Sequence, residues 1–188
     1  MNKMNIILLG ILLISNSIHA NSLEDGKKAY NKFDYTNALL YYNNACNAGY
    51  AEGCSALAGM YSVGAGVKPN DIKSYELNVK ACSLGGVNEC STLGDKYFFG
   101  KGINKDYFKA VKFYSNACKF YTKYFDNKND DFTTSMSRIS VAVGCNNLGQ
   151  MYHKGLGVKL DNFKAKEFFG KACDLQVNEG CENYAAIK

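Results

Sequence analysis

Cysteine is the residue type whose number and spacing specify a chemistry most directly in this 188-residue chain. A thiol can bind zinc, attack a substrate or pair with a second thiol. Zinc sites use Cys-x₂₋₄-Cys pairs or several histidines, but the closest cysteines here are eight residues apart, and His153 is the only histidine after residue 20. An even number of cysteines in an exported chain is typical of disulfides. The sequence therefore predicts disulfide bonds and no metal site for eight cysteines: Cys46, Cys54, Cys82, Cys90, Cys118, Cys145, Cys173 and Cys181.

The spacing of these cysteines reveals an internal repeat. Steps of 36 residues recur in the series 46, 82, 118 and 173 and in the series 54, 90, 145 and 181, once a single insertion of 19 residues is placed between Cys118 and Cys145. A fixed period of this length is typical of a solenoid. Paired cysteines would face each other across a helix hairpin, near the Cα separation of about 4.4–6.8 Å that a disulfide needs. The predicted bonds are Cys46–Cys54, Cys82–Cys90, Cys118–Cys145 and Cys173–Cys181.

A nucleophilic triad could be assembled only through His153, because no other histidine follows residue 20. His153 lies in a polar Tyr-His-Lys stretch before a glycine turn, so we expect it on the solvated surface. The sequence assigns no catalytic residue and predicts no cofactor.

The elements that position the cysteines follow from the same register. An Asp or Asn, typical of a helix N-cap, stands twelve residues before the first cysteine of each unit. Small and large apolar residues then alternate at helical spacing, and glycines close the second helix of each pair. We expect a leading helix at 23–32, then helices at 35–48, 51–63, 71–84, 87–99, 107–120, 142–153, 162–175 and 178–187. The units are 34–69, 70–105, 106–160 with the insertion, and a truncated 161–188.

Residues 1–20 have the organisation of a signal peptide. Lys3 precedes an apolar run from Ile6 to Ile14, and Ala20 is a small residue suited to cleavage before Asn21. The run is shorter than the roughly 20 apolar residues that span a bilayer. We therefore expect a secreted or periplasmic single-domain solenoid of residues 21–188, with no membrane anchor after cleavage.

The formal net charge of +5 is mild. It is compatible with acidic surfaces or cell-wall polymers, but export makes nucleic acid an improbable partner. We expect a monomer.

Two segments carry a resemblance to a known family. Residues 145–158 (CNNLGQMYHKGLGV) and 161–173 (DNFKAKEFFGKAC) resemble Sel1-like repeats, which are similar to tetratricopeptide repeats. With paired cysteines eight residues apart, the chain is similar to the Helicobacter cysteine-rich proteins. The resemblance implies an all-α, α/α solenoid with one disulfide per repeat, in a family catalogued as β-lactamases with weak penicillin binding or hydrolysis. The insertion and the short final unit depart from the family pattern.

Three functions follow as expectations. The first is a secreted scaffold that binds a protein or peptide. The second is a β-lactam or cell-wall-fragment binder or hydrolase, which rests on the resemblance because no serine after residue 20 begins the Ser-x-x-Lys motif. The third is a periplasmic structural or maturation factor.

The insertion, residues 119–143, is either a tolerated surface elaboration or a contact element for a partner. Residues 119–125 are expected to extend the preceding helix, residues 126–131 to form a loop, and residues 135–143 to lead into the next helix.

Overall fold

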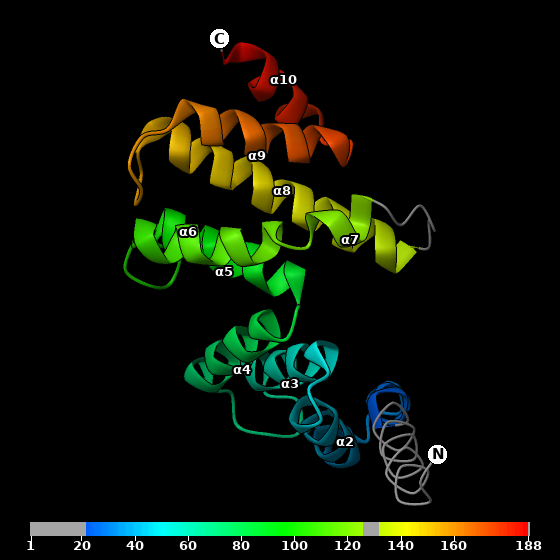
Figure 1. The fold of residues 1–188 in the computed structure, drawn as a ribbon. Coiled ribbons are helices and arrows are strands. Elements are labelled where there is room, and N and C mark those ends of the chain that lie inside the picture. The colour runs from blue at the N-terminus through cyan, green and yellow to red at the C-terminus, as the bar shows by residue number, and fades with distance from the viewer. Residues whose placement is uncertain (1–21, 126–131, 188) are drawn as a thin grey trace, which may run out of the picture. The chain divides into compact units, whose positions relative to one another are not determined.

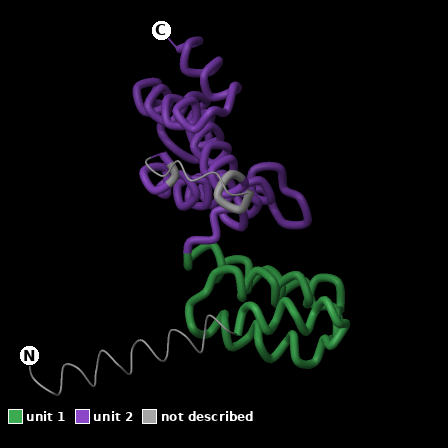
Figure 2. The backbone as a smooth tube through the Cα atoms, turned by 90° about the vertical axis from the view of Figure 1, so that its right-hand side faces the viewer, with its two compact units in different colours: residues 1–84 green, residues 85–188 purple. Residues whose placement is uncertain are grey.

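The computed structural model describes residues 22–125 and 132–187, and in these ranges the chain is helical without a strand (Figure 1). The predicted signal peptide, with its cleavage between Ala20 and Asn21, lies outside the described residues, as does the predicted loop at 126–131. The chain divides into two compact units, residues 1–84 and 85–188, which Figure 2 colours separately.

The first unit contains a leading helix at residues 22–31 and three further helices: α2 (Tyr35–Asn47), α3 (Ala51–Val63) and α4 (Asp71–Ser83). Its core is made of small and medium side chains, among them Ala38, Leu57 and Met60, with the ring of Tyr42. The expected helix bounds agree with these to within one residue.

The second unit contains six helices in its described residues, and from α5 to α10 they follow one another along the unit (Figure 1). The helices α5 and α6 pack against each other, as do α8 and α9, and α10 follows. Their bounds are α5 (Val87–Phe99), α6 (Tyr107–Cys118), α7 (Tyr121–Phe125), α8 (Phe132–Lys154), α9 (Asn162–Asp174) and α10 (Asn178–Ala186).

Capping residues set where the helices begin and end. Each expected N-cap accepts a hydrogen bond from the backbone N–H three residues later: Asp34 at 3.2 Å, Asn70 at 2.9 Å, Asp106 at 3.0 Å and Asp161 at 3.0 Å. Such bonds satisfy N–H groups that have no partner inside the helix. At the other end, Gly64 and Gly100 close α3 and α5 in the left-handed region, which glycine adopts without a Cβ clash.

The most deeply buried rings follow directly after a series of large apolar residues that recurs in the repeat, Tyr41, Leu77, Phe113 and Phe168. Of this series Leu77 and Phe113 are buried, and Tyr41 and Phe168 are half-buried. The rings that follow, Tyr42, Tyr114 and Phe169, are more deeply buried. The neighbouring helix approaches on that side, so these rings fill the space between the two helices of a pair.

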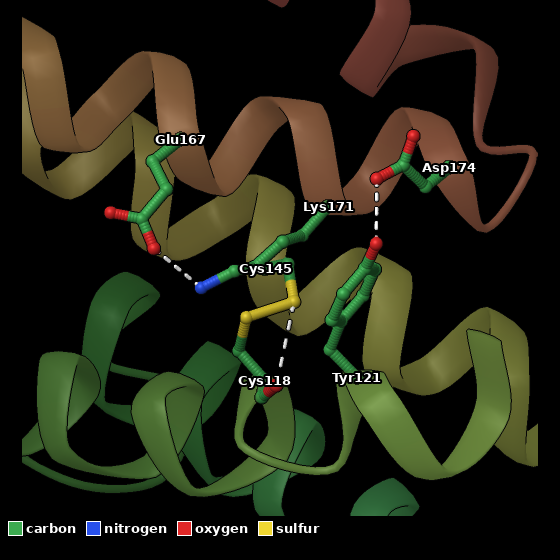
Figure 3. Close-up of polar contacts among 6 residues, drawn as sticks. All are labelled: Cys118, Tyr121, Cys145, Glu167, Lys171 and Asp174. Atoms are coloured by element: carbon green, nitrogen blue, oxygen red, sulfur yellow. Dashed lines mark hydrogen bonds and ion pairs between the residues drawn. A yellow bond between two sulfur atoms is a disulfide. The ribbon is translucent and has the colours of Figure 1, made fainter. Parts of the chain in front are cut away.

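The insertion differs from the expectation at its start. Residues 119–125 do not extend α6, which ends at Cys118, and α7 is a separate short helix. This break allows the Tyr121 hydroxyl to donate to Asp174 Oδ2 at 2.7 Å, which ties α7 to the end of α9 (Figure 3). The helix α8 starts at Phe132, ten residues before the predicted start at 142, so residues 135–143 are part of this helix and do not precede it as expected.

Disulfides close the helix hairpins. The structure contains Cys46–Cys54, Cys118–Cys145 and Cys173–Cys181, with Cα separations of 4.5, 4.7 and 4.5 Å. Figure 3 shows the second of these between α6 and α8. Cys82 in the first unit and Cys90 in the second are each disulfide-bonded as well. Their mutual pairing stays a prediction.

Candidate binding site

A hollow of about 200 Å³ lies in the second unit. Four helices contribute to it, because the stack brings the end of α5, Tyr114 of α6, the C-terminal half of α8 and the start of α10 to one place. Aromatic rings and polar side chains line it together: Phe98, Phe99, Tyr114, Asn147, Gln150 and Glu179. Mixed apolar and polar walls of this kind are typical of binding sites.

Tyr114 joins the hollow to the core. Its ring is only 1% exposed and packs against Gly94, where an added Cβ would come within 2.4 Å of the ring. Its hydroxyl donates to Asp95 Oδ1 at 2.7 Å, and Asn147 Nδ2 donates to the same oxygen at 3.4 Å. Burial, helped by the bond to Asp95, raises the pKa of Tyr114 far above its ordinary value. The phenol therefore stays neutral at physiological pH and acts as a donor that orients Asp95.

A second polar pair crosses from α8 to α10. Gln150 Nε2 donates to Glu179 Oε1 at 2.9 Å. Close by on the same two helices, Asn183 Nδ2 donates to the buried Asn146 Oδ1 at 2.9 Å. These bonds use amide donors and leave the side-chain carbonyl oxygens of Asn147 and Gln150 as acceptors at the hollow.

His153 is exposed at the end of α8, as expected, and its Nδ1 lies 2.8 Å from Asn162 Oδ1. No group of three or more possible metal ligands occurs in the described part of the chain. The cysteines predicted as site residues do not line the hollow. They hold the hairpins whose helices carry it.

Sequence reasoning missed the residues of the hollow. One signal was available: Asp95 and Gln150 hold equivalent places in the repeat register, as do Asn147 and Asn183. Polar side chains at matching positions of successive second helices indicate one face of the stack, because those helices lie side by side.

Comparison with known proteins gives the same repeat. The Sel1 repeat model matches residues 20–50, 51–86, 93–119 and 142–177. Each full match begins with the second helix of one hairpin and ends with the first helix of the next. HcpE of Helicobacter pylori, described as "Putative beta-lactamase HcpE", is 31% identical over 71 residues, which are 35% of this chain and 20% of that protein. The chain thus matches about a fifth of the length of that relative.

Two solved structures are similar to this chain. A Sel1 repeat protein from Oxalobacter formigenes superposes with a TM-score of 0.60 at 22% identity, covering 79% of this chain and 97% of that one. Cysteine rich protein B of Helicobacter pylori superposes with a TM-score of 0.50 at 31% identity, covering 79% of this chain and 93% of that one. The first likeness shows the solenoid fold, and the second extends to the sequence.

Proposed function

Because this chain belongs to the Sel1 repeat family, and within it to the cysteine-rich Helicobacter group, we propose that it is a binding scaffold that holds a peptide segment of a partner in the hollow of its second unit. Its disulfides and its Helicobacter relatives indicate a place outside the cytoplasm, where such bonds persist. No helix in residues 22–125 or 132–187 is long and apolar enough to cross a membrane.

The observation that carries the proposal is the mixture of polar side chains and aromatic rings that lines the hollow. Asn147 and Gln150 of α8 and Glu179 of α10 supply side-chain oxygens there, and Asp95 of α5 accepts from Asn147. An extended peptide presents backbone N–H groups that such acceptors bind, and the rings of Phe98 and Phe99 offer apolar contact to its side chains. Repeat proteins commonly use a surface built by successive helices in this way.

The test is capture of partners by the oxidised mature protein from the extracytoplasmic fraction of its source, quantified by mass spectrometry. The double variant Asn147→Ala with Gln150→Ala removes two acceptors from the hollow. We expect the double variant to bind a partner of the hollow about tenfold more weakly, which corresponds to a loss of roughly 1.4 kcal/mol of binding free energy. The matched control changes two exposed amides of α2, Asn43→Ala with Asn44→Ala, and should retain the partner.

Equal capture of partners by both double variants would show that the hollow does not bind them. Capture of nothing by any form, under conditions where the protein is intact and oxidised, would favour the periplasmic structural or maturation factor.

A second candidate is β-lactam binding with slow hydrolysis, which the name of the 31% identical HcpE favours. The described site offers a neutral tyrosine and carboxylates but no Ser-x-x-Lys motif. We expect hydrolysis of a chromogenic cephalosporin, if it belongs to this protein, to follow the protein peak through two chromatographic steps and to fall in the Asn147→Ala, Gln150→Ala variant. Activity that separates from the protein peak would contradict this candidate.

A further inference from the structure

One end of the second unit combines exposed aromatic side chains with lysines. The helices α5 and α8 end there and α6 and α9 begin there, joined by the glycine turns at residues 100–106 and 155–161. Figure 1 shows both turns on the same side of the stack. We call this surface the turn face.

The turn face exposes large apolar side chains that no core requires. Phe108 is 78% exposed and Phe163 is 84% exposed, while Phe99 and Leu160 are 55% and 58% exposed. Phe108 and Phe163 are the second residues of α6 and α9 and hold equivalent places in the repeat register. A single exposed apolar residue is ordinary on a protein surface. Recurrence at one register position, on adjacent hairpins, puts these rings on one surface.

The turn face carries more lysines than carboxylates, and Lys109 Nζ pairs with Asp106 Oδ2 at 3.5 Å. Two acidic residues lie among its lysines, Asp106 and Asp161, and both already accept hydrogen bonds from their own helix N-termini. Those N-termini add the positive ends of two helix dipoles. Some lysines lie over rings near this end: Lys101 Nζ is 5.0 Å from the centre of the Phe99 ring, and Lys109 Nζ is 5.1 Å from that of Tyr97. Six lysines belong to this face: Lys101, Lys105, Lys109, Lys154, Lys159 and Lys164.

We propose that the turn face docks on an anionic lipid bilayer. Lysines seek the headgroup phosphates, and the protruding rings of Phe108 and Phe163 enter the boundary between headgroups and acyl chains. An anionic polymer would satisfy the lysines alone and would leave both rings in water. Charge complementarity and ring exposure together therefore select a lipid surface. The docking is peripheral and adds to the proposed binding function; Phe99 borders both surfaces, whereas Phe108 and Phe163 do not line the hollow.

The chain contains no tryptophan, which makes a direct test possible. The variant Phe163→Trp carries a single reporter at the turn face. Its matched control, Phe33→Trp, carries the reporter at a 77% exposed ring in the first unit. Each oxidised mature protein is mixed with vesicles of phosphatidylcholine, with or without about one-third phosphatidylglycerol. We expect a blue shift of tryptophan emission, and quenching by brominated acyl chains, only for Phe163→Trp and only with the anionic vesicles.

Sedimentation with the same vesicles measures affinity. The double variant Phe108→Ser with Phe163→Ser should bind about fivefold more weakly than the wild type, because the rings no longer enter the bilayer. Binding of the wild type should also weaken between about 50 mM and 500 mM salt, because the lysine contacts are screened. Phe33→Ser should bind as the wild type does.

Three outcomes would overturn the proposal. The first is equal binding to neutral and anionic vesicles. The second is binding that the double serine variant leaves unchanged. The third is retention on a heparin column without any spectral shift on vesicles, which would identify an anionic polymer as the partner of this face.

Discussion

Tyr114 shows how one polar group is accommodated between two helices of this fold. Its ring fills the space beside Gly94, and its hydroxyl then lies deep enough to need a partner. Asp95 follows Gly94 directly and supplies that partner. In the next hairpin the equivalent ring is Phe169, which has no hydroxyl, and the equivalent of Asp95 is the uncharged Gln150. The buried ring and the polar residue that faces it thus change together from one repeat to the next.

The raised pKa of Tyr114 predicts how stability depends on alkaline pH. Tyrosine in the unfolded chain ionises near pH 10, whereas folded Tyr114 keeps its proton to higher pH, mainly because it is buried. The contribution of this tyrosine to the free energy of unfolding is therefore fully present below about pH 10 and is lost as the pH rises above it. Each such tyrosine makes the free energy of unfolding decrease by up to about 1.4 kcal/mol more per pH unit. Burial also raises the pKa of Tyr42, which adds to the slope.

Denaturant unfolding between about pH 8 and pH 11 checks this expectation. The Tyr114→Phe variant should lose about 1 kcal/mol at pH 8, because the hydrogen bond to Asp95 is gone. Its stability should then decline less steeply than that of the wild type above about pH 10. A variant that declines as steeply as the wild type would show that Tyr114 does not carry this dependence.

At the scale of helices, close approach within a pair depends on small residues facing rings. Gly94 of α5 faces Tyr114 of α6, and Gly149 of α8 faces Phe169 of α9. In the first unit the equivalent of Gly94 is Ala58, and the equivalent of Tyr114 is the smaller Asn78. Where the first helix of this contact carries a methyl group, the second helix therefore carries no large ring.

Two glycine substitutions separate this packing requirement from helix propensity. Gly94→Ala would bring its Cβ within 2.4 Å of the Tyr114 ring and should destabilise the protein by about 1–3 kcal/mol through overpacking. Gly59→Ala, inside α3 with no neighbour within 4 Å of the added Cβ, should instead stabilise it by about 0.5–1 kcal/mol. Thermal and denaturant unfolding measure both. Similar effects of the two substitutions would contradict the packing argument.

Helix bounds were predictable where a local signal marks them. Asp106 and Asp161 cap α6 and α9 through short-range hydrogen bonds, and Gly100 ends α5. The residues that set these boundaries are therefore local in the sequence. The insertion lacks such signals. The helix α6 ends at Cys118, and shortly after it Tyr121 makes a hydrogen bond to Asp174, which is 53 residues away in sequence. Contacts at that distance leave no local pattern.

At the scale of the molecule, the cysteine period was sufficient to predict the solenoid. Covalent pairing leaves a strict spacing, which survives the 19-residue insertion. The hollow could not be predicted in the same way, because its residues differ between repeats. Phe98, Asn147 and Glu179 come together only when three hairpins stack, and no single repeat contains the set.

The bridges Cys46–Cys54, Cys118–Cys145 and Cys173–Cys181 join cysteines only 8 or 27 residues apart along the chain. Each of these bridges can form once its own two helices are present, without any cysteine from further along the chain. Pairing of nearest neighbours in order of appearance yields these three bridges. We therefore expect an oxidant to be sufficient for their formation, with little of the shuffling that an isomerase performs on proteins whose bridges cross.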